Sequence, residues 1–452
     1  MRLLIATLFS VLVSLATVDV SAAPLAADFP AGLQVPADAR PGAAFDVDRA
    51  TASYLALLSP AQRERSDAYF EGGYWVAFWT LAYGLGVAFV LLATGLSVRM
   101  RDAAERVSRR PWLSTLVYAL LWVAVSFVLA APFSIYTDFV REHQYGLSEQ
   151  PFGSWLGDQL KGLAVQIVLM PIILVAIYAA VRRAGARWWM WATAIFFGFT
   201  LVTTMIAPVF IAPLFNHYQP LPAGPVRDAV LSLARANEVP TGHVEWFDAS
   251  KQTTRISANV SGLWGTTRLA LNDNLLKGTS RPEIKAVLGH EMGHYVLHHE
   301  FRFTVYLTLV FGVAFGLLHA AFDRALARWG PRWRLRDRAD PAALPLAMAI
   351  LSVVLYLAGP LLNAIGREAE NEADAYGLNA AREPYGFAMV SMRLSTYRKI
   401  APGPIEEILF FDHPSGYERV HRAMVWLREN PLPELAAEAA AAHGGAKAPG
   451  AK

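Results

Sequence analysis

The stretch VLGHEMGH at residues 287–294 contains the pattern His-Glu-x-x-His. Histidines four positions apart lie on one face of a helix, so His290 and His294 can bind the same zinc ion. Glu291, next to the first histidine, can reach a water at the metal and act as its general base. Residues 282–289 begin with proline and continue with an apolar face, which is typical of the start of a helix. The stretch therefore predicts a catalytic zinc helix. The alternative is a histidine pair that binds no metal.

The composition of the chain is that of a membrane protein. It has 452 residues, of which 54% are hydrophobic, 12% aromatic and 17% charged, whereas a soluble domain carries about 25% charged residues. There is no cysteine, so any metal must be held by histidine, aspartate or glutamate. The net charge is only +3 and the arginines are clustered. This pattern indicates membrane topology, with the lipid bilayer as a partner, and argues against nucleic-acid binding.

Six long apolar segments indicate transmembrane helices, because a helix needs about 20 residues to cross a bilayer. Tryptophans at or near the segment ends fit anchoring at the membrane interface. The segments cover about 74–98, 112–136, 155–181, 188–215, 303–322 and 342–365. A shorter apolar run within residues 1–22 follows Arg2 and ends in small residues. We interpret it as a signal peptide, and a retained first transmembrane helix is the alternative.

These features divide the chain into seven expected regions. The tail is rich in Ala, Gly and Lys, a composition that indicates disorder. The predicted regions are a signal peptide or first transmembrane helix (1–22), an N-terminal polar and helical segment (23–71), transmembrane helices (72–216), a zinc-peptidase insertion (217–302), further transmembrane helices (303–365), a C-terminal catalytic region (366–430) and a disordered tail (431–452).

Arginines are concentrated in three connections that lie on one side of the membrane by the parity of the spans. Residues 99–111 contain five, 182–187 three and 324–338 six, whereas the opposing residues 137–154 contain one. Positively charged short loops stay in the cytoplasm. We therefore expect a protein of the bacterial inner membrane whose zinc site faces the periplasm.

A third zinc ligand must come from elsewhere in the chain, because catalytic zinc takes three protein ligands and leaves one position for water. A metzincin would place a third histidine shortly after the motif, and the pattern does not continue in that way. Residues 366–374 offer Glu368, Glu370 and Glu372. On a helix Glu370 and Asp374 share one face, while Glu368 and Glu372 share another. Spacing alone leaves the choice open, and a solvated acidic helix is the alternative.

The chain resembles the type I CAAX prenyl proteases in three features. These are the His-Glu-x-x-His motif, its spacing to Arg367-x-x-Glu370-x-x-Ala373-Asp374, and the arrangement of several membrane spans. The type I CAAX prenyl proteases are membrane zinc metallopeptidases of the gluzincin kind. Matching stretches also occur at 211–215, at 413–414 and at 418–419, and the resemblance extends from about residue 60 to 430. It implies a mainly α membrane protein in which six or seven transmembrane helices form a chambered barrel, with a small α+β zinc-peptidase domain. The family usually has serine at position 366, where this chain has glycine.

The resemblance also implies roles for individual residues. Glu370 would be the third metal ligand, giving one zinc ion per subunit, and Asp374 would orient a ligand histidine. His413 and Arg419 would stabilise the tetrahedral intermediate or hold the substrate. Asn259 matches a residue of the family's edge strand, to which an extended peptide could add. The alternatives are a loop histidine, a surface cation, a helix salt bridge and an ordinary hairpin. We interpret His298 and His299 as residues that do not bind the metal.

The predicted function is that of a membrane-embedded zinc metalloendopeptidase, a hydrolase that uses a metal-activated water. Its partner would be a peptide or a membrane-protein substrate. Within enzymes, the alternative to a CAAX prenyl protease is a membrane protein quality-control protease without prenyl specificity. A non-catalytic, chaperone-like membrane protein that binds zinc is a third possibility. Glu291 argues against the last one, because a structural zinc has no use for a general base.

Overall fold

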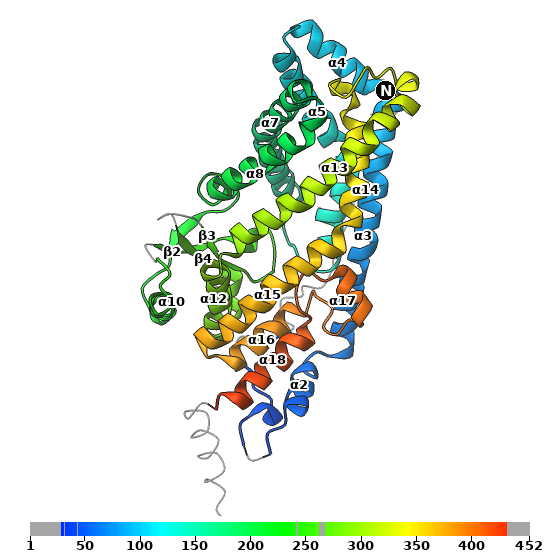
Figure 1. Ribbon diagram of the computed structural model, residues 1–452. Coiled ribbons are helices and arrows are strands. Elements are labelled where there is room, and N and C mark those ends of the chain that lie inside the picture. The colour runs from blue at the N-terminus through cyan, green and yellow to red at the C-terminus, as the bar shows by residue number, and fades with distance from the viewer. Residues whose placement is uncertain (1–28, 31, 43, 241–242, 262–266, 432–452) are drawn as a thin grey trace, which may run out of the picture. The chain divides into compact units, whose positions relative to one another are not determined.

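The computed structural model describes residues 29–431 apart from 31, 43, 241–242 and 262–266 (Figure 1). The predicted signal segment and almost all of the predicted disordered tail lie outside the described residues. The chain divides into two compact units. Of the described residues, the membrane unit contains 73–217 and 300–365, and the motif unit contains those from 29 to 72, from 218 to 299 and from 366 onward.

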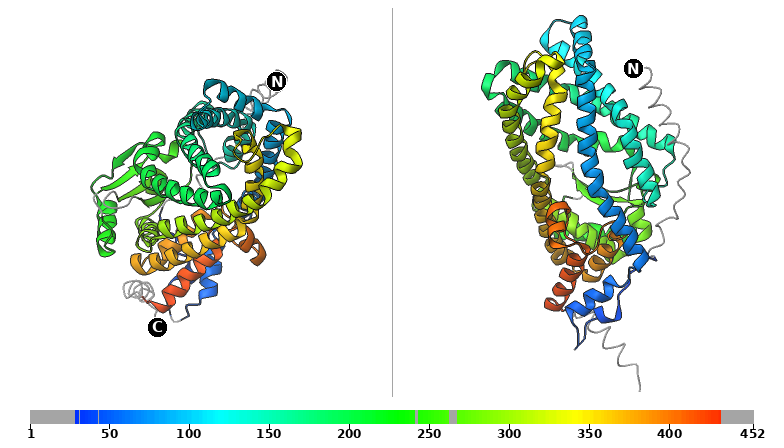
Figure 2. Two further views of the ribbon diagram at one scale, coloured as in Figure 1. Left: turned by 45° about the horizontal axis from the view of Figure 1, so that its top comes forward. Right: turned by 90° about the vertical axis from the view of Figure 1, so that its right-hand side faces the viewer.

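Five helical segments of the described residues are long and apolar enough to span a membrane, and a bent pair of helices makes a sixth. The first of them, α3, runs unbroken in the right-hand view of Figure 2. The helical elements that begin in or before the membrane unit are α3 (Pro60–Ala93), α4 (Leu96–Val107), α5 (Pro111–Ser134), η3 (Ile135–Val140), α6 (Arg141–Gln144), α7 (Phe152–Arg183), η4 (Gly185–Arg187), α8 (Trp188–Ile206), η5 (Ala207–Ile211), α9 (Ala212–Phe215), α13 (His299–Trp333), η7 (Pro341–Ala343), α14 (Leu344–Leu357) and α15 (Gly359–Ala381).

Two of the six predicted spans differ from the observed helices in an informative way. The first ends at Ala93, because Gly95 adopts a left-handed backbone (φ 66°) and α4 begins after it. The arginine-rich connection is therefore largely a helix. The sixth is broken between α14 and α15 with a bend of 51°, next to Pro360, which has no N–H to offer to the helix. The stretch 366–374, which contains the candidate glutamates, lies on α15 and is therefore a helical continuation of the last apolar segment.

The motif unit is built on a small mixed sheet with the strand order β1-β2-β4-β3. β2 and β4 are parallel, and β1 and β3 are antiparallel to their neighbours, so β3 is an edge strand within the described residues. The remaining elements of this unit surround the sheet and α12. The elements are η2 (Ala37–Ala39), α2 (Val47–Leu55), β1 (Tyr218–Pro220), α10 (Pro225–Ala236), β2 (His243–Phe247), η6 (Ala249–Lys251), β3 (Ala258–Ser261), β4 (Arg268–Asn272), α11 (Asp273–Gly278), α12 (Arg281–Val296), α16 (Pro384–Leu394), α17 (Pro404–Phe410) and α18 (Gly416–Glu429).

The helix α12 is held between two hydrophobic clusters of the motif unit. Its residues Ile284, Leu288 and Met292 are buried in a cluster with the strands β3 and β4 and with α10. Its residue Ala286 faces a second cluster, to which α2, α16 and α18 contribute. Burial on both sides fixes the rotation of α12 about its axis, and this determines where its polar residues point.

Candidate metal centre

The helix α12 begins where the sequence predicts a helix start, and this start is capped. The side chain of Glu283 accepts hydrogen bonds from the backbone amide and the hydroxyl of Ser280, closing a capping box, and Pro282 lies in the first turn. Glu283 is fully buried and also forms an ion pair with Arg393 of α16. These contacts anchor the helix at the end opposite to its histidines.

Small residues allow α12 and α15 to approach each other closely. A Cβ atom added to Gly293 would lie 3.0 Å from the Cα atom of Ala373, and one added to Gly289 would lie 3.0 Å from the carbonyl oxygen of Gly377. The glycine inside the His-Glu-x-x-His motif is therefore explained by packing. The close approach brings the glutamates of α15 within reach of the histidines of α12.

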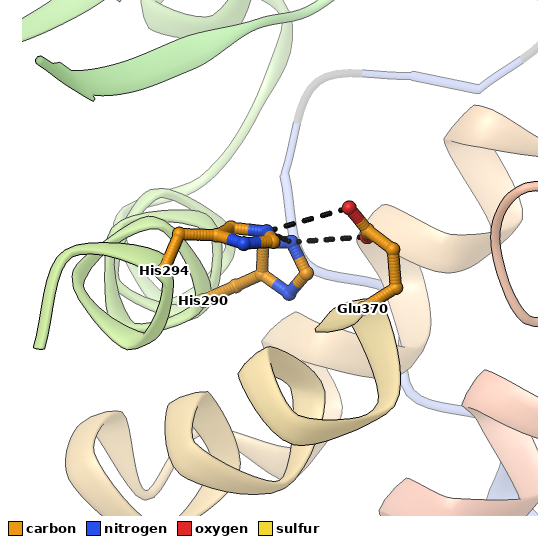
Figure 3. A group of neighbouring side chains, drawn as sticks. All are labelled: His290, His294 and Glu370. Atoms are coloured by element: carbon orange, nitrogen blue, oxygen red, sulfur yellow. Dashed lines mark hydrogen bonds and ion pairs between the residues drawn. The ribbon is translucent and has the colours of Figure 1, made fainter. Parts of the chain in front are cut away.

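His290, His294 and Glu370 converge at one point, as Figure 3 shows. The two Nε2 atoms of the histidines are 3.1 Å apart. The Oε2 atom of Glu370 lies 3.3 Å from Nε2 of His290, and its Oε1 atom lies 3.4 Å from Nε2 of His294. Ligands bound to a tetrahedral zinc at 2.0–2.1 Å are separated by about 3.3–3.5 Å. The three side chains thus fit a zinc ion with respect to donor type and spacing.

Charged residues hold His290 and Glu370 from behind. Oδ1 of Asp374 lies 2.8 Å from Nδ1 of His290, on the ring edge opposite Nε2. Arg419, from α18, donates to Glu370 at 2.7 Å, and its Nε atom lies 3.0 Å from Asp374. Arg422 also contacts Asp374, at 3.2 Å. Asp374 is fully buried, so its negative charge requires these cations.

The pKa values of two residues of the site, His290 and Glu291, are shifted from their ordinary values. Burial lowers the pKa of His290, but the carboxylates of Asp374 and Glu370 outweigh it and raise this pKa to about 10. Burial raises the pKa of Glu291 above its ordinary value, against the opposing influence of His290 and His294. A carboxyl group with a raised pKa, in a cavity beside potential metal ligands, is typical of a catalytic site.

His413 completes the group on a third segment of the motif unit. Its Nε2 atom lies 3.4 Å from Oε1 of Glu370, and its Nδ1 atom lies 2.7 Å from Asp412. The segment before His413 is fastened to α15 because Arg367 donates to the carbonyl oxygens of Glu407 and Phe411. This contact of Arg367 could not be predicted, because it depends on a loop path that the sequence does not specify.

A cavity of about 310 Å³ opens beside these groups within the motif unit. His290, Glu291, His294, Glu370, His413 and Arg419 all line it. Its other lining is largely apolar and includes Ile256, Leu275, Val287, Phe387, Val390 and Leu394. The residues leading into the edge strand β3 also border it, since Ser257 and Ala258 are part of the lining. Asn259 follows them on β3, opposite Ala270 of β4.

The structure therefore brings together seven of the eight site residues predicted from the sequence, with Asn259 just beyond the cavity. Of the three candidate glutamates, only Glu370 faces both histidines. Glu368 is exposed, whereas Glu372 lies 2.9 Å from Nε2 of His299. The contact of His299 with His294 was not predicted, because nothing in the sequence indicates that the ring of His299 returns to the motif.

Two family models match the chain in succession. The model described as CAAX prenyl protease N-terminal, five membrane helices, matches residues 49–217, and the model of peptidase family M48 matches residues 220–426. Together they cover most of the chain.

Two relatives are named as proteases. A protein named uncharacterized metalloprotease YhfN of Bacillus subtilis is 28% identical over 337 residues, which is 74% of this chain and 79% of that protein. The CAAX prenyl protease 1 homolog of Arabidopsis thaliana is 33% identical over 181 residues, and the match covers 40% of this chain and 42% of that protein. The chain thus matches less than half the length of this prenyl protease.

A solved structure shares the fold. The crystal structure of Ste24p of S. mikatae aligns with a TM-score of 0.67 at 21% sequence identity, and covers 81% of this chain and 89% of that one. The predicted fold class, a mainly α membrane protein of the chambered type with a small α+β peptidase domain, is confirmed. Of the predicted six or seven transmembrane helices, the described residues contain five, or six with the bent pair.

Proposed function

The chain belongs to the M48 family of metallopeptidases, and from this premise we propose that it hydrolyses peptide bonds at one zinc ion held by His290, His294 and Glu370. The observation that carries this proposal is the spacing of 3.1–3.4 Å among the two histidine Nε2 atoms and the carboxylate oxygens of Glu370, which suits tetrahedral zinc. The enzyme is an integral membrane protein and a metalloendopeptidase by family.

A bound zinc ion would polarise the scissile carbonyl and acidify a water molecule in the cavity. Glu291 would accept the proton from the attacking water and pass it to the leaving amine. Its raised pKa makes the carboxylate a better proton acceptor than an exposed glutamate. Asp374 would keep the ring of His290 oriented and would receive its Nδ1 proton.

His413 and Arg419 have different tasks in this proposal. Arg419 is 7% exposed, and two carboxylates engage its guanidinium group. It would fix Glu370 and Asp374 and add positive charge near the reacting carbonyl. His413 is more accessible, with 27% of its side chain exposed. It would donate a hydrogen bond to the oxyanion that develops during attack.

The substrate we propose is an extended peptide segment. The edge strand β3 begins at Ala258 in the lining of the cavity, so a peptide could pair with β3 and place a carbonyl at the metal. Asn259, as part of β3, would belong to this peptide-binding edge. The apolar lining favours hydrophobic side chains next to the scissile bond. Prenylated proteins fit this chemistry, and so do hydrophobic segments of membrane proteins.

The arginine distribution favours membrane or exported proteins as substrates. Fourteen arginines lie in three connections of one side, against one in the opposing connection. The positive-inside rule then places the zinc site at the periplasmic face of a bacterial inner membrane.

The central test uses a Glu291→Gln variant. It should keep its zinc, because Glu291 is not among the three converging ligands, and lose peptide hydrolysis by about 100-fold or more. Zinc content and casein hydrolysis would be measured on the same detergent-purified samples, with and without a chelator. Glu368→Gln, an exposed glutamate outside the cavity, is the matched control and should stay active. Full activity of Glu291→Gln would contradict the mechanism.

A further inference from the structure

His299 lies directly behind the metal ligand His294. The Nδ1 atoms of the two rings are 2.9 Å apart. On its other side, Nε2 of His299 lies 2.9 Å from Oε2 of Glu372. His299 is 5% exposed, so it is enclosed by protein although it begins a helix.

A sharp turn brings His299 back to the motif. The helix α12 ends at Val296, and His298 has a left-handed backbone with φ of 56°. This conformation is uncommon for a residue other than glycine. The amide of His298 donates to the carbonyl oxygen of Tyr295, which closes the turn. As a result, the residue five positions after His294 lies against its ring.

The protonation of the three groups follows from the role of His294. Its Nε2 atom faces the other ligands, so this atom must carry a lone pair when a metal binds. The proton of the neutral ring is then on Nδ1 and is donated to Nδ1 of His299. His299 in turn carries its proton on Nε2 and donates it to the carboxylate of Glu372. Every donor in this chain of contacts has an acceptor.

We propose that His299 and Glu372 are positioning residues that fix the tautomer and orientation of His294. They serve His294 as Asp374 serves His290, but with an imidazole placed between the ligand and the carboxylate. The inference rests on the proposed metal site. Hydrogen-bond partners behind a metal ligand typically contribute 10- to 100-fold to metal affinity or activity.

Two variants whose side chains have the same branched heavy-atom skeleton separate hydrogen bonding from packing. In His299→Asn the side-chain oxygen occupies roughly the place of Nδ1 and can still accept from His294. His299→Leu has the same skeleton of four side-chain heavy atoms and cannot accept a hydrogen bond. We expect the zinc dissociation constant of His299→Leu to rise by about 10- to 100-fold, and that of His299→Asn to stay within a few-fold of the wild type. It would be measured by competition with a chelator on the purified full chain.

The same variants loaded with cobalt give a second readout. The visible absorption of Co²⁺ depends on the geometry of its ligands, so His299→Leu should change the spectrum and His299→Asn should largely preserve it. Glu372→Leu should weaken zinc binding by about 10-fold, because His299 loses the acceptor that holds its ring. His298→Asn is the control, since His298 is exposed and asparagine tolerates its left-handed backbone.

Distinct outcomes would overturn the inference and the proposed function. Equal zinc affinities of His299→Asn and His299→Leu would overturn the inference. If both affinities were normal, zinc binding would not need His299. If both were equally reduced, the hydrogen-bond acceptor for His294 would not be what matters. A normal zinc affinity of Glu372→Leu would show that Glu372 is not a positioning residue. If the wild-type chain itself bound no zinc, or kept its affinity after Glu370→Ala, the proposed metal site would fail instead.

Discussion

Gly377 lies against the backbone of His290. A Cβ atom at position 377 would be 2.7 Å from the amide nitrogen of His290 and 2.9 Å from its Cα atom, a separation that real Cβ atoms do not show. Gly377 is two helical turns after Glu370 and shares its face of α15. The absence of one side chain at this position therefore lets α15 lie close enough for Glu370 to meet the histidines.

Gly377→Ala should accordingly weaken both the fold and the metal site. Overpacking of this kind typically costs about 1–3 kcal/mol, and a displaced α15 would move Glu370 away from His290 and His294. We expect a lower unfolding temperature and a lower zinc affinity. The control is Gly359→Ala on the same helix, where an added Cβ atom meets nothing within 4 Å. Unchanged zinc affinity in Gly377→Ala would mean that the helices can separate without consequence.

Glu370→Ala should lose most of its zinc on dialysis, whereas Glu368→Ala should retain it. Glu370 is the carboxylate that faces both histidines, and Glu368 points to solvent. Removing one of three protein ligands leaves too few donors for a stable zinc site. Metal content would be measured by atomic emission on both variants after identical dialysis. Equal zinc retention by the two variants would exclude Glu370 as a ligand.

Zinc binding to the metal-free protein should release about one proton from His290 at neutral pH. The pKa of His290 is about 10, above the ordinary 6.5. Between pH 6.5 and pH 10 the ring is therefore protonated, and it must lose this proton to bind metal. Zinc affinity should therefore rise about tenfold per pH unit in this window and level off above it. Titration calorimetry in two buffers of different ionisation enthalpy counts the protons.

The cause of this raised pKa can be tested with Asp374→Asn. The variant removes the charge at 2.8 Å from Nδ1 of His290, so the pKa should fall and fewer protons should be released at pH 8. Circular dichroism would verify that the protein is folded. Glu368→Gln removes an equal charge from the exposed face of the same helix and should leave proton release unchanged. Proton release that is the same in all three proteins would refute the pairing of Asp374 with His290.

Some parts of the site were accessible from the sequence because they depend on local geometry. His290 and His294 are four residues apart on a helix, so their shared face follows from helical periodicity. The choice of Glu370 over Glu368 and Glu372 could not be made from spacing alone. It depends on the packing of α15 against α12, and on this point the family resemblance made the prediction.

Other parts could not be predicted because they depend on single backbone conformations and tertiary contacts. The position of His299 requires the left-handed residue His298, and histidine gives no sequence signal for that conformation. The bend at residue 358 likewise divides a segment whose hydropathy is continuous. The hydrogen bond from Arg367 to the carbonyl oxygen of Glu407 depends on the path of the segment before His413.

The orientation of the chain in the membrane gives the last prediction. Short connections rich in arginine stay in the cytoplasm because translocating them is unfavourable. The connections at 99–111, 182–187 and 324–338 carry fourteen arginines, and 137–154 carries one. Cleavage or retention of the first apolar segment does not change which side these connections share. The zinc site, carried by segments on the opposite side by parity, should therefore face the periplasm.

Reporter fusions in a bacterial host test this orientation. Alkaline phosphatase fused after Asn430 should be active and green fluorescent protein fused there should be dark, because the first needs the periplasm and the second the cytoplasm. Fusions after Arg187, within an arginine-rich connection, are the control and should show the opposite pattern. If both positions gave the reverse result, the arginine-rich connections would lie outside. The substrates of the protease would then have to be sought in the cytoplasm.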